Sequence, residues 1–120
     1  MRRMAIGGAA LLVCGAAAGA ELAGTWKIDS SVGENPVVIH CTLVQAGDAL
    51  TGQCRPQVDG IEPSALTGSV TGAKAKWGYD VVFNGNPGRV DYEADVAADG
   101  SLRGTLFLSG NATPFTAAKL

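Results

Sequence analysis

The chain has few of the residues that build catalytic and metal sites. It holds one histidine, His40, and three cysteines among 120 residues. A side-chain nucleophile needs an adjacent base, and a structural zinc site needs about four nitrogen or sulfur ligands. The sequence also lacks a phosphate-binding glycine-rich loop between a strand and a helix. It therefore predicts a protein that is not an enzyme and that holds no cofactor and no metal.

Basic residues and long apolar runs are also scarce. Lysine and arginine together number 9, against 11 aspartates and glutamates, so the basic footprint of a nucleic-acid-binding protein is missing. No stretch reaches the length of about 20 apolar residues that a membrane helix requires. We expect no nucleic-acid partner and a chain that is not embedded in a membrane.

The first twenty residues, MRRMAIGGAALLVCGAAAGA, follow the order of a secretory signal peptide. A basic start is followed by an uncharged run and by small residues at the end. This order predicts residues 1–20 as a signal peptide cleaved after Ala20, and residues 21–120 as one domain that is periplasmic or extracellular. The alternatives are an uncleaved anchor and a lipoprotein acylated at Cys14.

The two cysteines beyond the signal peptide fit a disulfide across a hairpin. The stretch CTLVQAGDALTGQC runs from Cys41 to Cys54, with Gly47 and Asp48 at its centre. A two-residue type II′ turn there places the cysteines opposite each other on a non-hydrogen-bonded pair, where strands approach most closely. A zinc site or a redox pair is disfavoured, because His40 points to the other face and the spacing is not C-x-x-C.

Apolar and polar side chains alternate along most of residues 21–120, which is the period of half-buried strands. Turns rich in glycine, asparagine and aspartate separate the runs. At one of them, a three-residue loop ending at Gly100 pairs Val96 with Leu102 and keeps the apolar faces aligned. We predict eight strands, at 22–29, 36–46, 49–56, 64–71, 74–84, 88–97, 101–109 and 112–119. Such a meander buries its apolar face by closure, so the predicted fold is all-β, a single antiparallel up-and-down β-barrel.

A Leu-x-Gly pattern recurs in four of these strands, and the alternation places each of its glycines on the inward face. The glycines are Gly24, Gly52, Gly68 and Gly104. Inward glycines either let strands bend tightly around a filled core or leave room for a guest molecule.

The start LAGTW, from Leu22 to Trp26, resembles that of the calycin barrels: lipocalins, avidins and fatty-acid-binding proteins. The Gly-Asp–Leu-Thr-Gly hairpin is similar to hairpins of small secreted bacterial domains with no established activity. This resemblance implies that Trp26 plugs one end of the barrel. The L-x-G-x-W start and the single disulfide also resemble periplasmic inhibitors of serralysin-type metalloproteases. In those inhibitors an N-terminal trunk enters the protease, whereas only Glu21 precedes Leu22 here after cleavage.

Aromatic residues on the inward face are the candidate ligand contacts. These residues are Trp26, Trp77, Tyr79, Phe83 and Tyr92. They either line a cavity for a small hydrophobic ligand or fill the core. Phe107 falls on the outer face and is the candidate contact for a protein partner.

Three carboxylates, Asp91, Glu93 and Asp95, project from the outer side of one strand, and Asp80 is a predicted neighbour. They form either a cation site or a solvated face that resists aggregation. Because a straight strand does not make carboxylates converge, we favour the solvated face. The sequence as a whole predicts a binding module for a small hydrophobic ligand, with a protein-interaction barrel as the alternative, and leaves the oligomeric state open.

Overall fold

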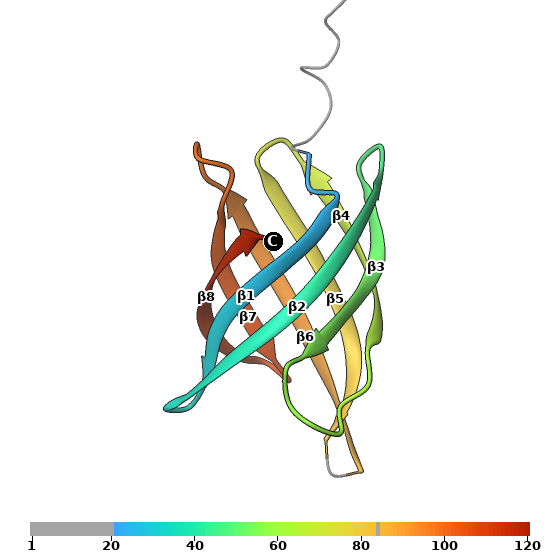
Figure 1. Cartoon of the computed structure of the whole chain (residues 1–120), viewed down its shortest axis with the longest axis vertical. Coiled ribbons are helices and arrows are strands. Elements are labelled where there is room, and N and C mark those ends of the chain that lie inside the picture. The colour runs from blue at the N-terminus through green and yellow to red at the C-terminus, as the bar shows by residue number, and fades with distance from the viewer. Residues whose placement is uncertain (1–20, 84) are drawn as a thin grey trace, which may run out of the picture.

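The structure, a computed structural model, describes residues 21–83 and 85–120. The predicted signal peptide lies outside the described residues. Eight antiparallel strands form one closed barrel in chain order, with β8 paired to β1 (Figure 1). The strands are β1 (Gly24–Val32), β2 (Asn35–Ala46), β3 (Ala49–Pro56), β4 (Ser64–Thr71), β5 (Lys74–Phe83), β6 (Asn86–Val96), β7 (Leu102–Leu108) and β8 (Asn111–Lys119). No helix within the described residues is long and apolar enough to cross a bilayer.

The predicted all-β up-and-down barrel of eight strands is confirmed, and its largest boundary difference lies in the first hairpin. We expected the first strand to span residues 22–29. The structure continues β1 to Val32, with Ser30 and Ser31 opposite Val37 and Pro36 of β2. Cross-strand pairing outweighs the weak strand preference of serine here.

The two ends of the barrel carry different turns. We call the end with the β1–β2 turn, the 57–63 loop and the β7–β8 turn the lower end, as it is oriented in Figure 1. The upper end carries the β2–β3 and β4–β5 turns and the 97–101 loop. The 97–101 loop has the predicted register, with Val96 opposite Leu102 and Gly100 at a φ of 88°.

The hairpin of β2 and β3 also has its predicted register. Gly47 has a φ of 64°, which the first central residue of a type II′ turn requires. Cys41 lies opposite Cys54, their Cα atoms are 4.0 Å apart, and their sulfurs form a disulfide. Both cysteines are fully buried. A buried disulfide is consistent with an oxidising compartment.

We expect the double substitution Cys41→Ala/Cys54→Ala to lower the free energy of unfolding by about 2–3 kcal/mol. The bridge closes a short loop, with a sequence separation of 13 residues, so its effect on the unfolded chain is moderate. Urea unfolding followed by tryptophan fluorescence measures the change. Wild-type protein unfolded with a reductant should give nearly the same midpoint as the variant, and a midpoint unmoved by either treatment would contradict the prediction.

Trp26 closes the interior at the upper end. Its side chain is 1% exposed, and its indole N–H donates a hydrogen bond to the Leu22 carbonyl over 2.9 Å. The Lys119 ammonium lies 5.3 Å from the ring centroid and covers the ring from outside. The upper interior is therefore filled by one large side chain that is held from both sides.

An aromatic cluster fills the middle of the barrel. Trp77 stacks on Tyr92 with 4.9 Å between ring centroids, and Phe115 packs edge-on against Tyr92 at 5.4 Å. Such pairs contribute beyond their buried area. Together with Trp26, this cluster places large, closely packed side chains in the upper and middle interior.

The inward glycines permit close approach between strands. A Cβ on Gly68 would overlap the carbonyl oxygen of Lys76 and crowd Trp77 on the neighbouring strand. A Cβ on Gly104 would likewise overlap the carbonyl oxygen of Glu93. Of the two explanations considered for these glycines, the structure favours tight bending around a filled core.

The seam between β1 and β8 closes the barrel only in its upper part. Its ladder ends at Asp29 and Thr116. The next hydrogen-bonded pair of that register would be Ser31 with Pro114, but proline has no N–H to donate. The Ser30 hydroxyl instead donates to the Pro114 carbonyl over 2.9 Å. Side chains, rather than the backbone ladder, therefore hold the lower part of the seam.

Candidate functional site

An apolar cavity of about 110 Å³ lies at the lower end of the barrel. Strands β1, β2, β5, β6 and β7, the end of β3 and the start of the 57–63 loop provide its walls. The lining residues are Ser30, Ser31, Val32, Val37, Ile39, Pro56, Val58, Tyr79, Val81, Val90, Leu106 and Leu108. Apart from two serines and one tyrosine, every side chain in the lining is apolar. We call this cavity the lower mouth.

One buried tyrosine, Tyr79, lines the lower mouth, and a second, Tyr92, lies behind it in the core. Tyr79 lines the cavity, and its hydroxyl forms a hydrogen bond of 2.6 Å with the hydroxyl of Tyr92. Burial raises the pKa of Tyr79 to about 12, although the hydrogen bond from Tyr92 opposes the rise. Burial and the neighbouring Tyr79 raise the pKa of Tyr92 well above its ordinary value. Both phenols stay neutral at physiological pH, so the cavity presents an uncharged surface.

Of the candidate ligand contacts, the structure brings only Tyr79 to the lower mouth among those whose side chains it describes. Trp26, Trp77 and Tyr92 are packed in the filled interior. The side chain of Phe83, at the end of β5, lies outside the described residues. The aromatic residues identified in the sequence therefore mark the core more than the cavity.

Most of the wall of the lower mouth is aliphatic and was not singled out from the sequence. Val37, Val81, Val90 and Leu106 sit at inward positions near the lower turns. The signal was present in the alternation, because inward residues close to turns at the same end must lie around one opening. Val58 gave no such signal, since it belongs to a loop.

The apolar lining continues onto an exposed rim. Val32 is 49% exposed and Val58 is 51% exposed, and both line the lower mouth. Val82, near the lower end of β5, is 65% exposed. Val82 does not line the cavity, but Val32 and Val58 join exposed apolar surface to the apolar cavity, and such surface is typical of an interaction site.

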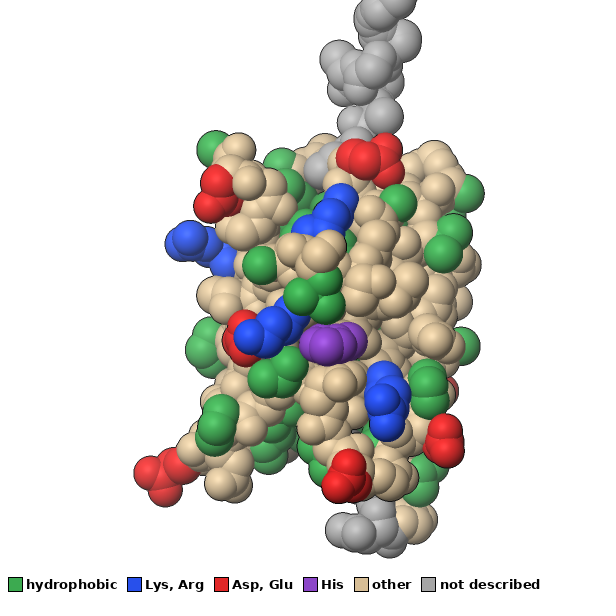
Figure 2. All heavy atoms as spheres, viewed as in Figure 1, with side chains coloured by type: hydrophobic (Ala, Val, Ile, Leu, Met, Phe, Trp, Pro, Cys, Tyr) green, Lys and Arg blue, Asp and Glu red, His purple; other side chains and the backbone are tan. Residues whose placement is uncertain are grey.

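The lower loops add negative charge to this rim. Glu34 lies two residues after Val32, in the β1–β2 turn. Asp59 comes directly after Val58 in the 57–63 loop, which also contains Glu62. All three carboxylates are exposed, and Figure 2 shows acidic side chains at the lower end of one face. The turns at 33–34 and 109–110 and the 57–63 loop contain no lysine or arginine.

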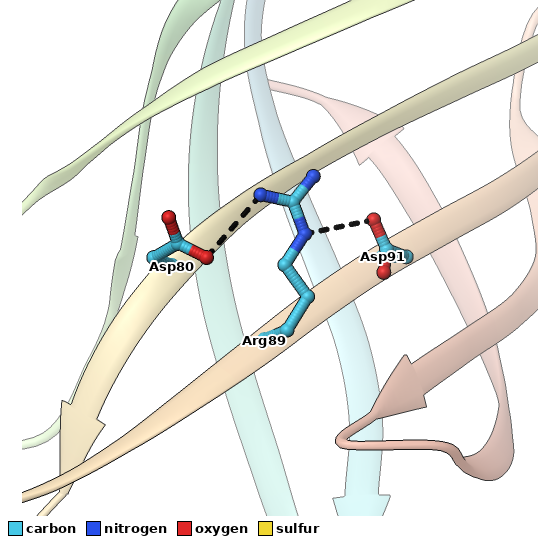
Figure 3. Close-up of polar contacts among 3 residues, drawn as sticks. All are labelled: Asp80, Arg89 and Asp91. Atoms are coloured by element: carbon cyan, nitrogen blue, oxygen red, sulfur yellow. Dashed lines mark hydrogen bonds and ion pairs between the residues drawn. The ribbon is translucent and has the colours of Figure 1, made fainter.

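The nearest cations on the adjoining strands are already engaged. Arg89 Nη1 lies 3.4 Å from Asp80 Oδ1, and Arg89 Nε lies 3.2 Å from Asp91 Oδ1 (Figure 3). Arg55 Nε donates to the Ile61 carbonyl over 3.2 Å, which holds its guanidinium against the 57–63 loop. The Arg55 charge therefore adjoins the rim with no ion pair to a carboxylate among the described residues, and the three carboxylates Glu34, Asp59 and Glu62 still outnumber it.

The outer carboxylates do not converge on one point. Asp91 is bound by Arg89, and Asp95 forms an ion pair of 2.6 Å with Lys74. Asp80, predicted as a further member of the group, contacts the same Arg89. Among the described residues, no group of three histidine, cysteine, aspartate or glutamate side chains is arranged to hold a metal.

Phe107 is half-buried rather than exposed. It lies at the edge of a shallow depression of about 380 Å³ on the outer face of the barrel. The floor of the depression includes Gly78, over which the Arg89 side chain extends. This surface is open and broad, so it encloses a partner group less than the lower mouth does.

No protein-family model, curated protein or solved structure matches this chain. The eight-stranded barrel is compatible with a calycin-like fold. The functional argument therefore depends on the lower mouth itself.

Proposed function

We propose that the protein is a non-enzymatic binding module of the periplasm or the extracellular space, and that its lower mouth takes up an apolar group. The observation that carries this proposal is the open cavity, whose walls are mostly aliphatic and whose one aromatic side chain is the neutral Tyr79. Apolar surface left open to water gains free energy when a complementary group covers it, by roughly 25 cal/mol per Å².

Two further observations support the proposal. Trp26 and the cluster around Tyr92 are buried and packed against their neighbours, whereas the lower mouth is an open apolar space. The disulfide and the composition of residues 1–20 support an oxidising compartment reached by secretion.

We expect toluene, a neutral apolar probe, to bind in the lower mouth of the wild-type protein. Methyl resonances of Val37, Val81 and Leu106 should shift and saturate in an NMR titration, because these side chains line the cavity. Val37→Trp should abolish the saturable shifts by filling the cavity, since Val37 is half-buried at its wall.

The matched control is Val44→Trp, because Val44 is 55% exposed outside the barrel. This variant adds the same indole and should bind toluene like the wild type. Two results would contradict the proposed site: methyl shifts of the wild type that never saturate with toluene, or toluene-induced shifts that are equal in Val37→Trp and Val44→Trp.

A further inference from the structure

The volume of the lower mouth limits how much of a partner can enter it. Its 110 Å³ compares with about 150 Å³ for a cavity that holds one benzene molecule, and with about 300–1,000 Å³ for typical small-molecule sites. One branched or aromatic side chain is of suitable size. The rest of any partner must therefore lie outside, over the exposed Val32 and Val58.

The charge of the rim selects among partners that could insert such a group. A fatty acid would bring its carboxylate close to Glu34, Asp59 and Glu62, and like charges at short range disfavour binding. A partner with lysine or arginine beside its apolar group would be attracted to the same carboxylates. Arg89 is paired with Asp80 and Asp91, and Arg55, held on the Ile61 carbonyl, offsets only one of the three rim carboxylates, so the preference for a cationic partner remains.

The seam between β1 and β8 changes its contacts beside the cavity. Ser31 lines the lower mouth, and it lies beyond Asp29 and Thr116, where the ladder ends. There β8 is held beside β1 by the hydrogen bond from the Ser30 hydroxyl to the Pro114 carbonyl and by the contact between the Ser31 and Thr113 hydroxyls. An extended peptide can pair with the backbone donors and acceptors of β1 here by displacing these side-chain contacts. An alkyl chain cannot use these donors and acceptors, whereas a peptide can.

We propose that the lower mouth binds an extended basic segment of a protein partner. The segment inserts one apolar side chain into the cavity and places lysine or arginine side chains against Glu34, Asp59 and Glu62. This inference rests on the proposed function, since it requires that the mouth takes up an apolar group.

The test is an NMR titration with three probe peptides: acetyl-KKLKK-amide, acetyl-EELEE-amide and acetyl-KKAKK-amide. We expect the first to shift the methyl resonances of Val37 and Leu106 saturably and to bind about tenfold more tightly than the second. The third lacks the leucine side chain and should leave those methyl resonances unmoved. Added salt should weaken binding of the first peptide, because the rim charges are exposed and therefore screened.

A pair of charge-reversal variants tests the rim. Glu34→Lys/Asp59→Lys should weaken binding of acetyl-KKLKK-amide about tenfold. Glu21→Lys/Asp48→Lys makes the same change in net charge at the upper end and should alter binding less than about twofold. Equal effects of the two variants would overturn the assignment of the basic segment to this rim.

Other occupants give distinct outcomes. If dodecanoate binds at the mouth as tightly as acetyl-KKLKK-amide, the inferred basic peptide is wrong, and an anionic lipid is the indicated ligand. Mouth resonances that shift on dilution of the protein alone would indicate a second copy of this chain. If toluene binds but none of the peptides does, the inference that the partner is a basic segment is wrong, and the proposed function stands. If neither toluene nor any peptide moves the mouth resonances, both proposals are wrong.

Discussion

Trp26→Ala is expected to lower the free energy of unfolding by about 3–5 kcal/mol. The side chain is 1% exposed at the upper end of the barrel, and its removal leaves a cavity that the rigid strands cannot close. The Leu22 carbonyl would also lose the indole N–H that bonds to it. Urea unfolding monitored by circular dichroism measures the loss without relying on the deleted fluorophore.

The control for this variant is Lys119→Ala, which removes the ammonium above the ring together with its exposed methylene chain. Because Lys119 is exposed, its removal should cost less than about 1 kcal/mol. A loss below about 1 kcal/mol for Trp26→Ala itself would show that this indole is not part of the core, and would make it a candidate surface contact.

Gly68→Leu is expected to destabilise the barrel by about 3 kcal/mol or more. The first atom of any side chain at Gly68 would overlap the carbonyl oxygen of Lys76, and the two strands must separate to admit it. Gly68→Ala should already cost about 1–3 kcal/mol for the same reason. Thermal and urea unfolding, recorded for both variants, measure these effects.

Gly88→Ala is the matched control, since it adds one methyl group at another strand glycine. A Cβ there would lie 3.3 Å from the Ser109 hydroxyl oxygen and 3.4 Å from a Val81 methyl carbon. These neighbours can yield slightly, so we expect a change below about 1 kcal/mol. If Gly68→Ala lowered the free energy of unfolding no more than Gly88→Ala does, free space beside Trp77 would be indicated. A ligand in the middle of the barrel would then again be a candidate.

The fold could be predicted from the sequence because two signals agreed. The alternation of apolar residues indicated which side chains face inward, and the turn residues fixed the register. At Gly47 the turn type alone was enough to place Cys41 opposite Cys54. Register is well determined wherever a one-residue slip would move apolar side chains into water.

The candidate site was harder to predict, because it depends on volume rather than pattern. The same alternation places Val81 and Trp77 on the inward face, but only packing in three dimensions fills the space around Trp77 and leaves the space beside Val81 open. Val58 contributes from a loop, where no periodicity exists. The close approach at Gly68 likewise depends on the distance between neighbouring strands, which the sequence does not encode locally.

The incomplete seam has a consequence for how the barrel forms and opens. Seven of the eight strand pairings join neighbours in the chain, whereas the pairing of β1 with β8 joins segments from opposite ends of the described sequence. Closing so long a loop carries the largest entropy cost of any pairing in the molecule. The seam should therefore form last during folding and break first during sub-global opening. Because Pro114 stops the ladder next to the lower mouth, such an opening would start beside the cavity and would leave the disulfide-bonded hairpin intact.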